Sequence, residues 1–333
     1  MNYINFSFIF ISFFFTFFVG KFLKKLGLYD VPTERSMHTF DIVRGGGLAV
    51  VVCLMLLISY HLVIDSLDNV IGISMIICIF VVGLLGFCDD FKSLSFKFRL
   101  LIHFLVASFT VLILQDNINN INLYPLPING ILKDLFFILF IVWFINLYNF
   151  MDGINGIASA QAIYFFSSLT ALSIFIPDIS HEIYLGYSAI FFGFLLWNFP
   201  NPRIFLGDVG SGSIGVFIAV NIISISSIDP NLFWISLILM SIFIVDTTFT
   251  LLVRILLRQS FHQAHNSHVY QKSAAALNSH TKVTSMIVFF NTVIILPLIV
   301  VFLIFKWDLF YLLLAVYFFL ASLALYLKAG RSE

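Results

Sequence analysis

The chain has 333 residues, of which 61% are hydrophobic and only 10% are charged, and its mean hydropathy is +1.05. A chain of this composition cannot cover itself with a polar surface, which excludes a water-soluble globular protein and indicates an integral membrane protein surrounded by lipid. The formal net charge of zero and the pI near 7.1 favour no class of soluble partner, and we expect no nucleic-acid partner.

Apolar stretches follow one another along the whole chain. They lie at roughly 4–20, 47–64, 70–88, 98–115, 131–147, 157–176, 183–198, 211–226, 232–254, 283–305 and 308–327. These stretches are continuously apolar and do not alternate with period two, which predicts helices rather than a membrane β-barrel. We therefore expect an all-α polytopic fold with about 11 transmembrane helices in a single membrane domain, residues 1–333.

The distribution of Lys and Arg predicts the orientation. No basic residue precedes the first stretch, whereas Lys21, Lys24 and Lys25 follow it, so we expect a retained helix with the N-terminus outside rather than a cleaved signal peptide. With eleven alternating spans, all but two of the 17 Lys and Arg residues are cytoplasmic, the exceptions being Lys133 and Lys306. The C-terminus is then cytoplasmic as well.

Nearly all side chains suited to chemistry lie in loops on the predicted inner face. These loops are residues 21–46, 89–97, 146–156, 198–212 and 255–282. Loops that face one compartment can converge on one site, so we expect a single functional site on the cytoplasmic side.

Carboxylates and carboxamides are prominent in these loops. They are Asp89, Asp90, Asp152 and Asp208, with Asn146, Asn149 and Asn155. Ionisable groups at a membrane border are costly and indicate function, although a helix cap or turn is the alternative for any single one. Hard oxygen donors suit Mg²⁺ or Mn²⁺. Because magnesium takes one or two protein ligands beside substrate phosphates, at least one carboxylate is left for acid or base work.

Glycine-rich segments at residues 44–47, 152–156 and 207–212 each lead into a predicted helix. Backbone amides at such helix starts can bind anions, although glycine also serves turns and close helix packing. Arg44, Lys97 and Arg99 add the positive charge that a diphosphate would need.

Three histidines, His262, His265 and His268, are spaced three apart in the last inner loop. This spacing leaves open a zinc site, phosphate binding or proton transfer, and a merely interfacial loop, and we favour the phosphate-facing role. Asp246 lies deep in the ninth stretch and needs a partner, for which Arg254 is a candidate.

Five ordered segments together resemble a known family. They are VPTERSMHTFDIVRGGG, DDFKSLSFKFR, NLYNFMDGINGIASAQ, FLGDVGSGSIG and HQAHNSHVYQK. They resemble the polyprenyl-phosphate N-acetylhexosamine-1-phosphate transferases of glycosyltransferase family 4, over residues from about 20 to 285. The segment HQAHNSHVYQK is similar to the branch that initiates O-antigen or capsule synthesis, whereas the peptidoglycan branch carries a consecutive His run followed by an acidic residue.

This resemblance implies a reaction at the cytoplasmic face of the bacterial inner membrane. A HexNAc 1-phosphate moves from a UDP-HexNAc to undecaprenyl phosphate, with UMP released and Mg²⁺ or Mn²⁺ as cofactor. By motif, Asp89 and Asp90 resemble the catalytic pair, Asp208 and Asn149 the metal ligands, Asp152, Asn155 and Asn146 the nucleotide- or sugar-binding positions, and Arg44, Lys97, Arg99, His265 and His268 the phosphate-binding positions. Asn155 stands where many bacterial members carry Asp, which suggests a hydrogen-bonding rather than a charged role.

Two other functions stay open. The phospho-muramoyl-pentapeptide translocase of peptidoglycan synthesis belongs to the same enzyme class and would be distinguished by its donor. An ion-coupled transporter also uses membrane carboxylates, but it would place several of them at mid-membrane, where the sequence has only Asp246. The sequence leaves open the HexNAc, the downstream glycan, a covalent intermediate, which of Asp89 and Asp90 is the base, and the oligomeric state, with a homodimer as one option.

Overall fold

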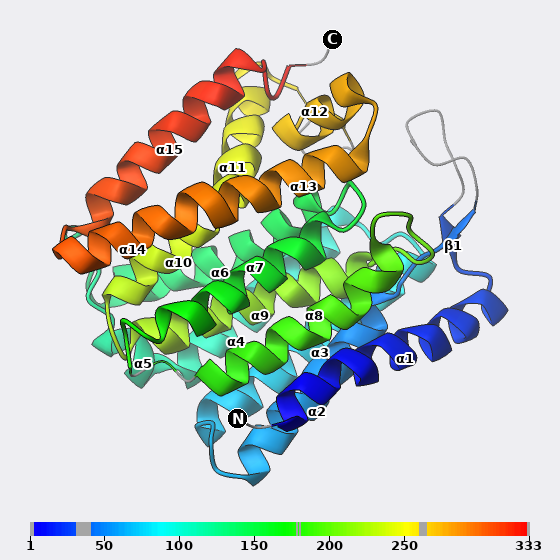
Figure 1. Cartoon of the computed structure of the whole chain (residues 1–333), viewed down its shortest axis with the longest axis horizontal. Coiled ribbons are helices and arrows are strands. Elements are labelled where there is room, and N and C mark those ends of the chain that lie inside the picture. Colours follow the sequence, from blue (N-terminus) through cyan, green and yellow to red (C-terminus); the bar gives the residue numbers. More distant parts are fainter. Residues whose placement is uncertain (1–2, 31–40, 178, 180, 260–264, 332–333) are drawn as a thin grey trace.

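The computed structural model of the chain describes residues 3–30, 41–177, 179, 181–259 and 265–331. Long helices run side by side through these ranges (Figure 1). The only strands in the described ranges are β1 (Tyr29–Asp30) and β2 (Ile42–Val43), which have two residues each and pair antiparallel. The expected all-α fold is thus confirmed.

The helices follow in chain order. They are α1 (Tyr3–Lys25), α2 (Gly47–Val63), α3 (Asn69–Phe91), α4 (Phe96–Ile113), α5 (Gln115–Asn120), α6 (Ile131–Met151), α7 (Ile157–Leu172), α8 (His181–Asn198), α9 (Asp208–Ser226), α10 (Asn231–Leu239), α11 (Ser241–Leu256), α12 (Val269–Leu277), α13 (His280–Phe290), the π-helix η1 (Asn291–Ile295), α14 (Leu296–Phe305) and α15 (Leu309–Tyr326).

Length and apolar composition identify the membrane-crossing helices. Within the described residues, seven helical segments qualify, namely α1, α3, α4, α6, α9, α13 to α14 through η1, and α15. The pair α10 and α11, bent by 69°, makes an eighth, while α2 and α7 are apolar but shorter. The chain is therefore a multi-pass membrane protein. Each expected apolar stretch overlaps a helix or a broken pair, but the count of eleven and the orientation of the termini stay predictions.

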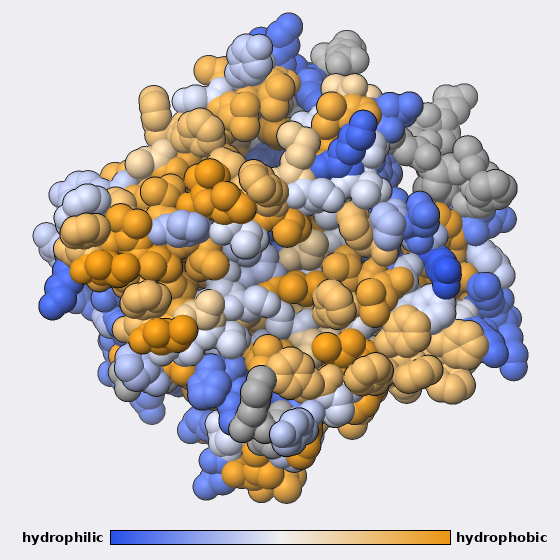
Figure 2. All heavy atoms as spheres, in the orientation of Figure 1, coloured by the Kyte–Doolittle hydropathy of each residue, from blue (hydrophilic) through white to orange (hydrophobic). Residues whose placement is uncertain are grey.

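The outer surface and the centre of the bundle differ as a membrane protein requires. Large apolar side chains such as Phe10, Phe14 and Phe18 of α1 are exposed. Figure 2 shows hydrophobic side chains gathered along α1 and over α14 on the visible face. In contrast, 94% of the span in α9 is buried inside the protein. A helix with no exposed polar face suits this central position, and α9 packs against α2, α3, α6 and α10.

Two glycines let neighbouring helices touch the start of α9. A Cβ added at Gly86 of α3 would collide with the backbone of Asp208, and one added at Gly47 of α2 would collide with the Cα of Gly210. Small residues permit such backbone contact between membrane helices. The last turn of α3, with Asp89 and Asp90, therefore lies directly against the N-terminus of α9.

Candidate active site

The predicted charged residues converge because each lies at the end of an element. Asp89 and Asp90 end α3, Asp208 begins α9, and Arg44 follows β2. Arg99 lies in the first turn of α4. Ser95 caps that helix by accepting a hydrogen bond from the backbone N–H of Phe98, a typical helix start.

Two arginines join the three carboxylates. Arg44 contacts Asp90 (Nε to Oδ1, 2.7 Å) and Asp208 (Nη2 to Oδ1, 2.9 Å). Arg99 contacts Asp89 (Nη1 to Oδ2, 2.7 Å) and Asp208 (Nη1 to Oδ2, 3.3 Å). Asp208 is therefore shared between both guanidinium groups, and the five side chains form one connected network, which we call the carboxylate–arginine cluster.

Asp90 is the most enclosed member of the cluster. Its side chain is 0% exposed, and its oxygens accept hydrogen bonds from the backbone N–H groups of Asp208 and Val209, each at 3.1 Å. A carboxylate at a helix N-terminus is stabilised by these unpaired amides and by the helix dipole. The chain's own carboxylate thus takes the place at the start of α9 that the glycine-rich segment was expected to offer to an anion.

The first glycine-rich segment also differs from expectation. The backbone N–H groups of Gly46 and Gly47 donate to the carbonyl oxygens of Phe205 and Leu206, both at 2.8 Å. These two amides are therefore not available to a phosphate, and the interpretation of residues 44–47 as an amide anion site is wrong for them. Their role is to hold the start of α2 against the segment that precedes α9.

The charge state of Arg44 follows from its surroundings. Burial alone lowers the pKa of a guanidinium, but the nearby carboxylates of Asp90 and Asp208 outweigh this effect and raise the pKa of Arg44 above its usual value. Arg44 is therefore a fixed positive charge at the centre of the cluster, as the sequence suggested for a phosphate-binding group.

Two pockets meet at the cluster. The larger has a volume of about 750 Å³ and the smaller of about 50 Å³. Asn149 and Asp208 line both of them. Asp89 lines the smaller pocket, whereas Asp90 lines neither. The two adjacent carboxylates, which the sequence could not tell apart, thus have different surroundings.

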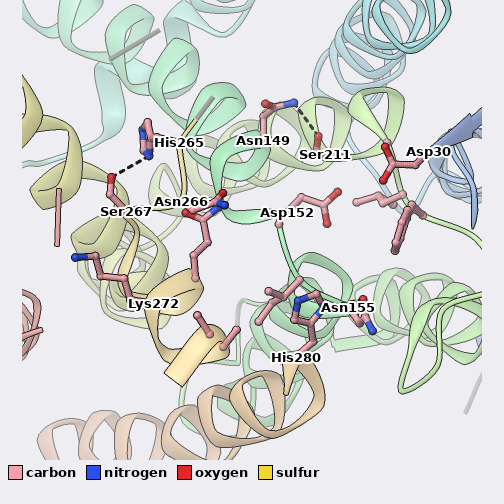
Figure 3. Close-up of a pocket in the computed structure, with 18 of the residues that line it drawn as sticks. Asp30, Asn149, Asp152, Asn155, Ser211, His265, Asn266, Ser267, Lys272 and His280 are labelled. Carbon is pink, nitrogen blue, oxygen red and sulfur yellow. Dashed lines mark hydrogen bonds between the residues drawn. The ribbon is translucent and has the colours of Figure 1, made fainter. Parts of the chain in front are cut away.

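Asp152 lies in the middle of the larger pocket, between Asn149 and Asn155 (Figure 3). Burial, and then the negative charge of Asp208, raise the pKa of Asp152 well above the usual value. The Nδ2 of Asn149 donates to Ser211 Oγ at 3.1 Å. Asn149 lines both pockets, so its carboxamide is within reach of a ligand in either of them.

Asn155 is held by contacts with the protein itself. Its Nδ2 donates to the carbonyl oxygen of Pro200 at 3.3 Å, its Oδ1 lies 3.1 Å from His280 Nδ1, and its carbonyl oxygen accepts from Thr284 Oγ1 at 2.8 Å. These contacts join the 152–156 turn to α13. A neutral carboxamide, which can both donate and accept, suits this position better than a carboxylate.

Of the three histidines spaced three apart, the two that the structure describes have different surroundings. His265 lines the larger pocket, and its Nδ1 lies 3.0 Å from Ser267 Oγ. Burial, with the neighbouring His268 and Arg254, lowers the pKa of His265 to about 4, so its ring is neutral at pH 7. His268 is 2% exposed and lines neither pocket. His262 lies outside the described residues, among which no group of three or more His, Cys, Asp or Glu is placed to hold a metal ion.

Asp246 holds this loop in place, a role that the sequence did not reveal. Its carboxylate accepts hydrogen bonds from the backbone N–H groups of Val269 (2.9 Å) and Tyr270 (3.0 Å), and its Oδ1 lies 3.2 Å from His268 Nδ1. Tyr270 in turn donates from its hydroxyl to the carbonyl oxygen of Phe150 at 2.8 Å. Asp246 thus fixes the start of α12 beside the end of α6. A lone carboxylate in an apolar helix was the available signal.

Some predicted residues lie outside the pocket expected for them, and some residues that line the pockets were not predicted. Lys97 is exposed on α4 and lines neither pocket, so its phosphate-binding role stays a prediction. Asn146 lines the smaller pocket together with His103, a residue that no motif in the sequence indicated. Arg331 lines the larger pocket, because Gly330 donates its N–H to the carbonyl oxygen of Ser267 at 2.9 Å.

The donor set at the junction of the pockets fits the expected divalent cation. Asp208 is 20% exposed, and Asn149 lines both pockets together with it. Magnesium binds through one or two protein oxygens together with water and substrate phosphates, and an open pocket provides room for these. Asp208 and Asn149 are therefore the residues that would hold Mg²⁺ or Mn²⁺.

The chain is similar to one known protein family and to several individual proteins. The family described as "Glycosyl transferase family 4" matches residues 72–226. Undecaprenyl-phosphate alpha-N-acetylglucosaminyl 1-phosphate transferase of Thermotoga maritima is 28% identical over 63% of this chain and 61% of its own length, which is less than two thirds of that relative. A probable undecaprenyl-phosphate N-acetylglucosaminyl 1-phosphate transferase of Bacillus subtilis is 25% identical over 79% of this chain and 74% of its own length.

A second kind of relative is also similar. Phospho-N-acetylmuramoyl-pentapeptide-transferase of Streptococcus thermophilus is 26% identical over 69% of this chain and 72% of its own length. The family match covers α3, α4, α6 and α9, and with them Asp89, Asp90, Arg99 and Asp208. Residues 72–226 therefore match glycosyl transferase family 4, and both kinds of relative are similar to the chain.

Proposed function

We propose that the protein transfers a HexNAc 1-phosphate from a UDP-HexNAc to undecaprenyl phosphate, which gives undecaprenyl-diphosphate-HexNAc and UMP. Such a step would initiate surface-polysaccharide synthesis, of O-antigen or capsule, at the cytoplasmic face of a bacterial inner membrane. The observation that carries the proposal is the carboxylate–arginine cluster between two pockets of unequal size. The names of the Thermotoga maritima and Bacillus subtilis relatives support it.

The two pockets suit the two substrates. The larger is lined by carboxylates, carboxamides and cations, which match a nucleotide diphosphate sugar. The smaller is lined by apolar side chains of α3, α4 and α6, such as Leu85, Leu100 and Ile145, with Asp89 and Arg99 among them. A small charged pocket within membrane helices suits the phosphate of a lipid. Asp208 and Asn149, which line both, would lie where the two substrates react.

The reaction follows from this placement. A phosphate oxygen of the lipid attacks the β-phosphorus of the nucleotide sugar, the bond from the β-phosphorus to the bridging oxygen breaks, and UMP leaves with that oxygen. Arg44 and Arg99 stabilise the negative charge that builds up on the phosphates. Bound Mg²⁺ or Mn²⁺ would offset further diphosphate charge.

The different surroundings of Asp89 and Asp90 support different roles for them in the reaction. Asp89 lines the smaller pocket, where it can take a proton from a monoanionic acceptor phosphate. Asp90 is enclosed by Arg44 and by the start of α9, so it positions Arg44 and Asp208. Asp89 is therefore the base and Asp90 a positioning residue.

The proposal is tested by incubating the purified protein with undecaprenyl phosphate, Mg²⁺ and a panel of UDP-HexNAc donors. We expect UMP release that requires the acceptor, stops on addition of a chelator and returns with excess Mg²⁺. The Asp208→Ala protein is expected to lose release or to need far more Mg²⁺ than the unchanged protein. Solute uptake into proteoliposomes without any UMP release would overturn the proposal in favour of a transporter.

A second candidate donor follows from the Streptococcus thermophilus relative, whose name states a phospho-N-acetylmuramoyl-pentapeptide transferase. The same panel therefore includes UDP-N-acetylmuramoyl-pentapeptide. UMP release with this donor and with no simple UDP-HexNAc would assign the chain to that reaction.

A further inference from the structure

His103 lies within the membrane-spanning part of α4 and yet faces a polar surrounding. It follows Arg99 by four residues, so both side chains lie on one face of the helix. His103 is 9% exposed and lines the smaller pocket together with Asp89 and Arg99. The imidazole therefore adds a hydrogen-bonding group to the pocket that we assign to the lipid phosphate.

The contacts of Asn146 fix the orientation of its carboxamide. Its Nδ2 lies 2.7 Å from the carbonyl oxygen of Val142 and 3.3 Å from His103 Nδ1. The atom that faces a carbonyl oxygen must be a donor, so the amide nitrogen, and not the amide oxygen, points this way. The same nitrogen then donates its second hydrogen to His103.

This hydrogen bond sets the tautomer of His103. Because Nδ1 accepts a hydrogen bond from Asn146, the proton of the neutral ring is on Nε2. His103 thus presents an N–H donor, which is what a phosphate oxygen accepts.

We propose that His103 binds the acceptor phosphate through Nε2–H and that Asn146 is the positioning residue that keeps this tautomer. The inference rests on the proposed function, because it assumes that the smaller pocket takes a phosphate monoester at the end of a polyprenyl chain. Within the pocket, Arg99 supplies charge and His103 supplies a directed neutral hydrogen bond, so the two groups hold the phosphate next to Asp89.

The first test compares His103→Gln with His103→Leu in the UMP-release assay. A glutamine amide keeps an N–H donor, so we expect nearly normal kinetics. Leucine has no donor, so we expect the KM for undecaprenyl phosphate to rise about tenfold or more, as for loss of a hydrogen bond to a charged group, while the KM for the UDP-sugar stays unchanged. The matched control is His181→Leu, which removes an exposed imidazole at the start of α8.

The second test removes the hydrogen bond that fixes the tautomer. In Asn146→Leu no donor faces Nδ1, so the ring proton is no longer held on Nε2, and no charge is added to the pocket. We expect the acceptor KM to rise, by less than in His103→Leu. Added to His103→Leu, the Asn146→Leu change should raise the acceptor KM no further, because it acts through His103.

Two outcomes overturn the inference while the proposed function stands. One is an unchanged acceptor KM in His103→Leu with only a lower melting temperature, which a polar contact between α4 and α6 would produce. The other is full additivity of the two changes. If the unchanged protein releases no UMP, the proposed function fails, and equilibrium binding of radiolabelled undecaprenyl phosphate to the same variants then decides the role of His103. Equal binding by His103→Leu and the unchanged protein would overturn it.

Discussion

The two pockets are lined by different kinds of structure. The smaller is formed by α3, α4, α6 and α9, whose charged residues lie at helix ends and are joined by short ion pairs. The larger also draws on the 152–156 turn, residues 265–267, α12 and Arg331 at the end of the described chain. The junction of the two consists of Asn149 and Asp208.

This difference separates the chemistry from donor recognition. Groups held between packed helices keep a fixed geometry, which phosphoryl transfer needs because positioning and electrostatics provide most of its catalysis. Loop segments can change without disturbing that geometry, so differences in donor are expected to lie in the larger pocket. Substitutions in the helix ends should therefore lower turnover, and substitutions in the loop segments should change the KM for the donor.

The largest effects are expected for Asp89 and Asp90. In both Asp89→Asn and Asp90→Asn, UMP release should fall by about 100-fold or more, through loss of the base in the first and of the position of Arg44 and Asp208 in the second. The melting temperatures should differ, because an amide NH₂ at position 90 would face the N–H donors of α9 and of Arg44. Activity and thermal unfolding are measured on the same detergent preparations.

Asp90→Asn should lose roughly 3 kcal/mol or more of stability, the usual effect of breaking one partner of a buried ion pair. Asp89 lines the smaller pocket, so the melting temperature of Asp89→Asn should be close to that of the unchanged protein. Equal melting of the two variants would contradict the division into base and positioning residue, and near-normal turnover of both would remove the cluster from catalysis.

Much of the smaller pocket could be predicted from sequence. Its charged residues flank long apolar runs, and helix ends on one side of a membrane lie close together, so the sequence alone is enough to group Asp89, Arg99 and Asp208. The division of labour within the Asp89-Asp90 pair could not be predicted, because it depends on the backbone contact of α3 with α9 at Gly86. Only packing shows which carboxylate enters the helix N-terminus.

The larger pocket was harder to predict because its parts are far apart in sequence. Asp246 accepts a hydrogen bond from the backbone N–H of Val269, which is 23 residues further along the chain. A 69° bend between α10 and α11 also precedes Asp246. Arg331 reaches the pocket only through the contact of Gly330 with Ser267. Neither contact leaves a periodic pattern in the sequence, since each joins one side chain or amide to a distant turn.

The next largest effect is expected for Asp246→Asn. An amide at position 246 can accept at one atom only, so α12 loses one of its backbone contacts and the loop with His265 and Ser267 shifts. We expect the KM for the UDP-sugar to rise about tenfold, with a smaller fall in turnover. Steady-state kinetics with each substrate varied in turn measures both.

Thr250→Val is the matched control, because it removes a neighbouring hydroxyl that donates to the same carboxylate at 3.2 Å and leaves the backbone contacts in place. A similar rise in donor KM for Thr250→Val would mean that general packing of α11, and not the anchoring of α12, is responsible.

A smaller effect is expected for Arg331→Ala. Arg331 lines the larger pocket, where a guanidinium would attract the diphosphate of the donor, so the donor KM should rise about threefold to tenfold with little change in acceptor KM. Lys97→Ala is the comparison, because the sequence assigned Lys97 to phosphate binding but the structure leaves it exposed and outside both pockets. An effect of Lys97→Ala larger than that of Arg331→Ala would reverse this ranking and restore the sequence-based assignment.

The smallest effect concerns the pH dependence of stability through His265. Its folded-state pKa is lowered to about 4, by burial first and then by His268 and Arg254, while an unfolded histidine titrates near 6.5. Between these values the unfolded state binds more protons, so this group lowers the stability of the fold as the pH falls from about 6.5 toward 4. The melting temperature is measured at pH 7.5 and at pH 5. The difference between the two values should be smaller in His265→Gln than in the unchanged protein, by roughly 2 °C. A larger fall in melting temperature in the variant than in the unchanged protein would mean that His265 binds a proton in the folded protein. The larger pocket would then hold the diphosphate with a charged imidazole and not with a neutral one.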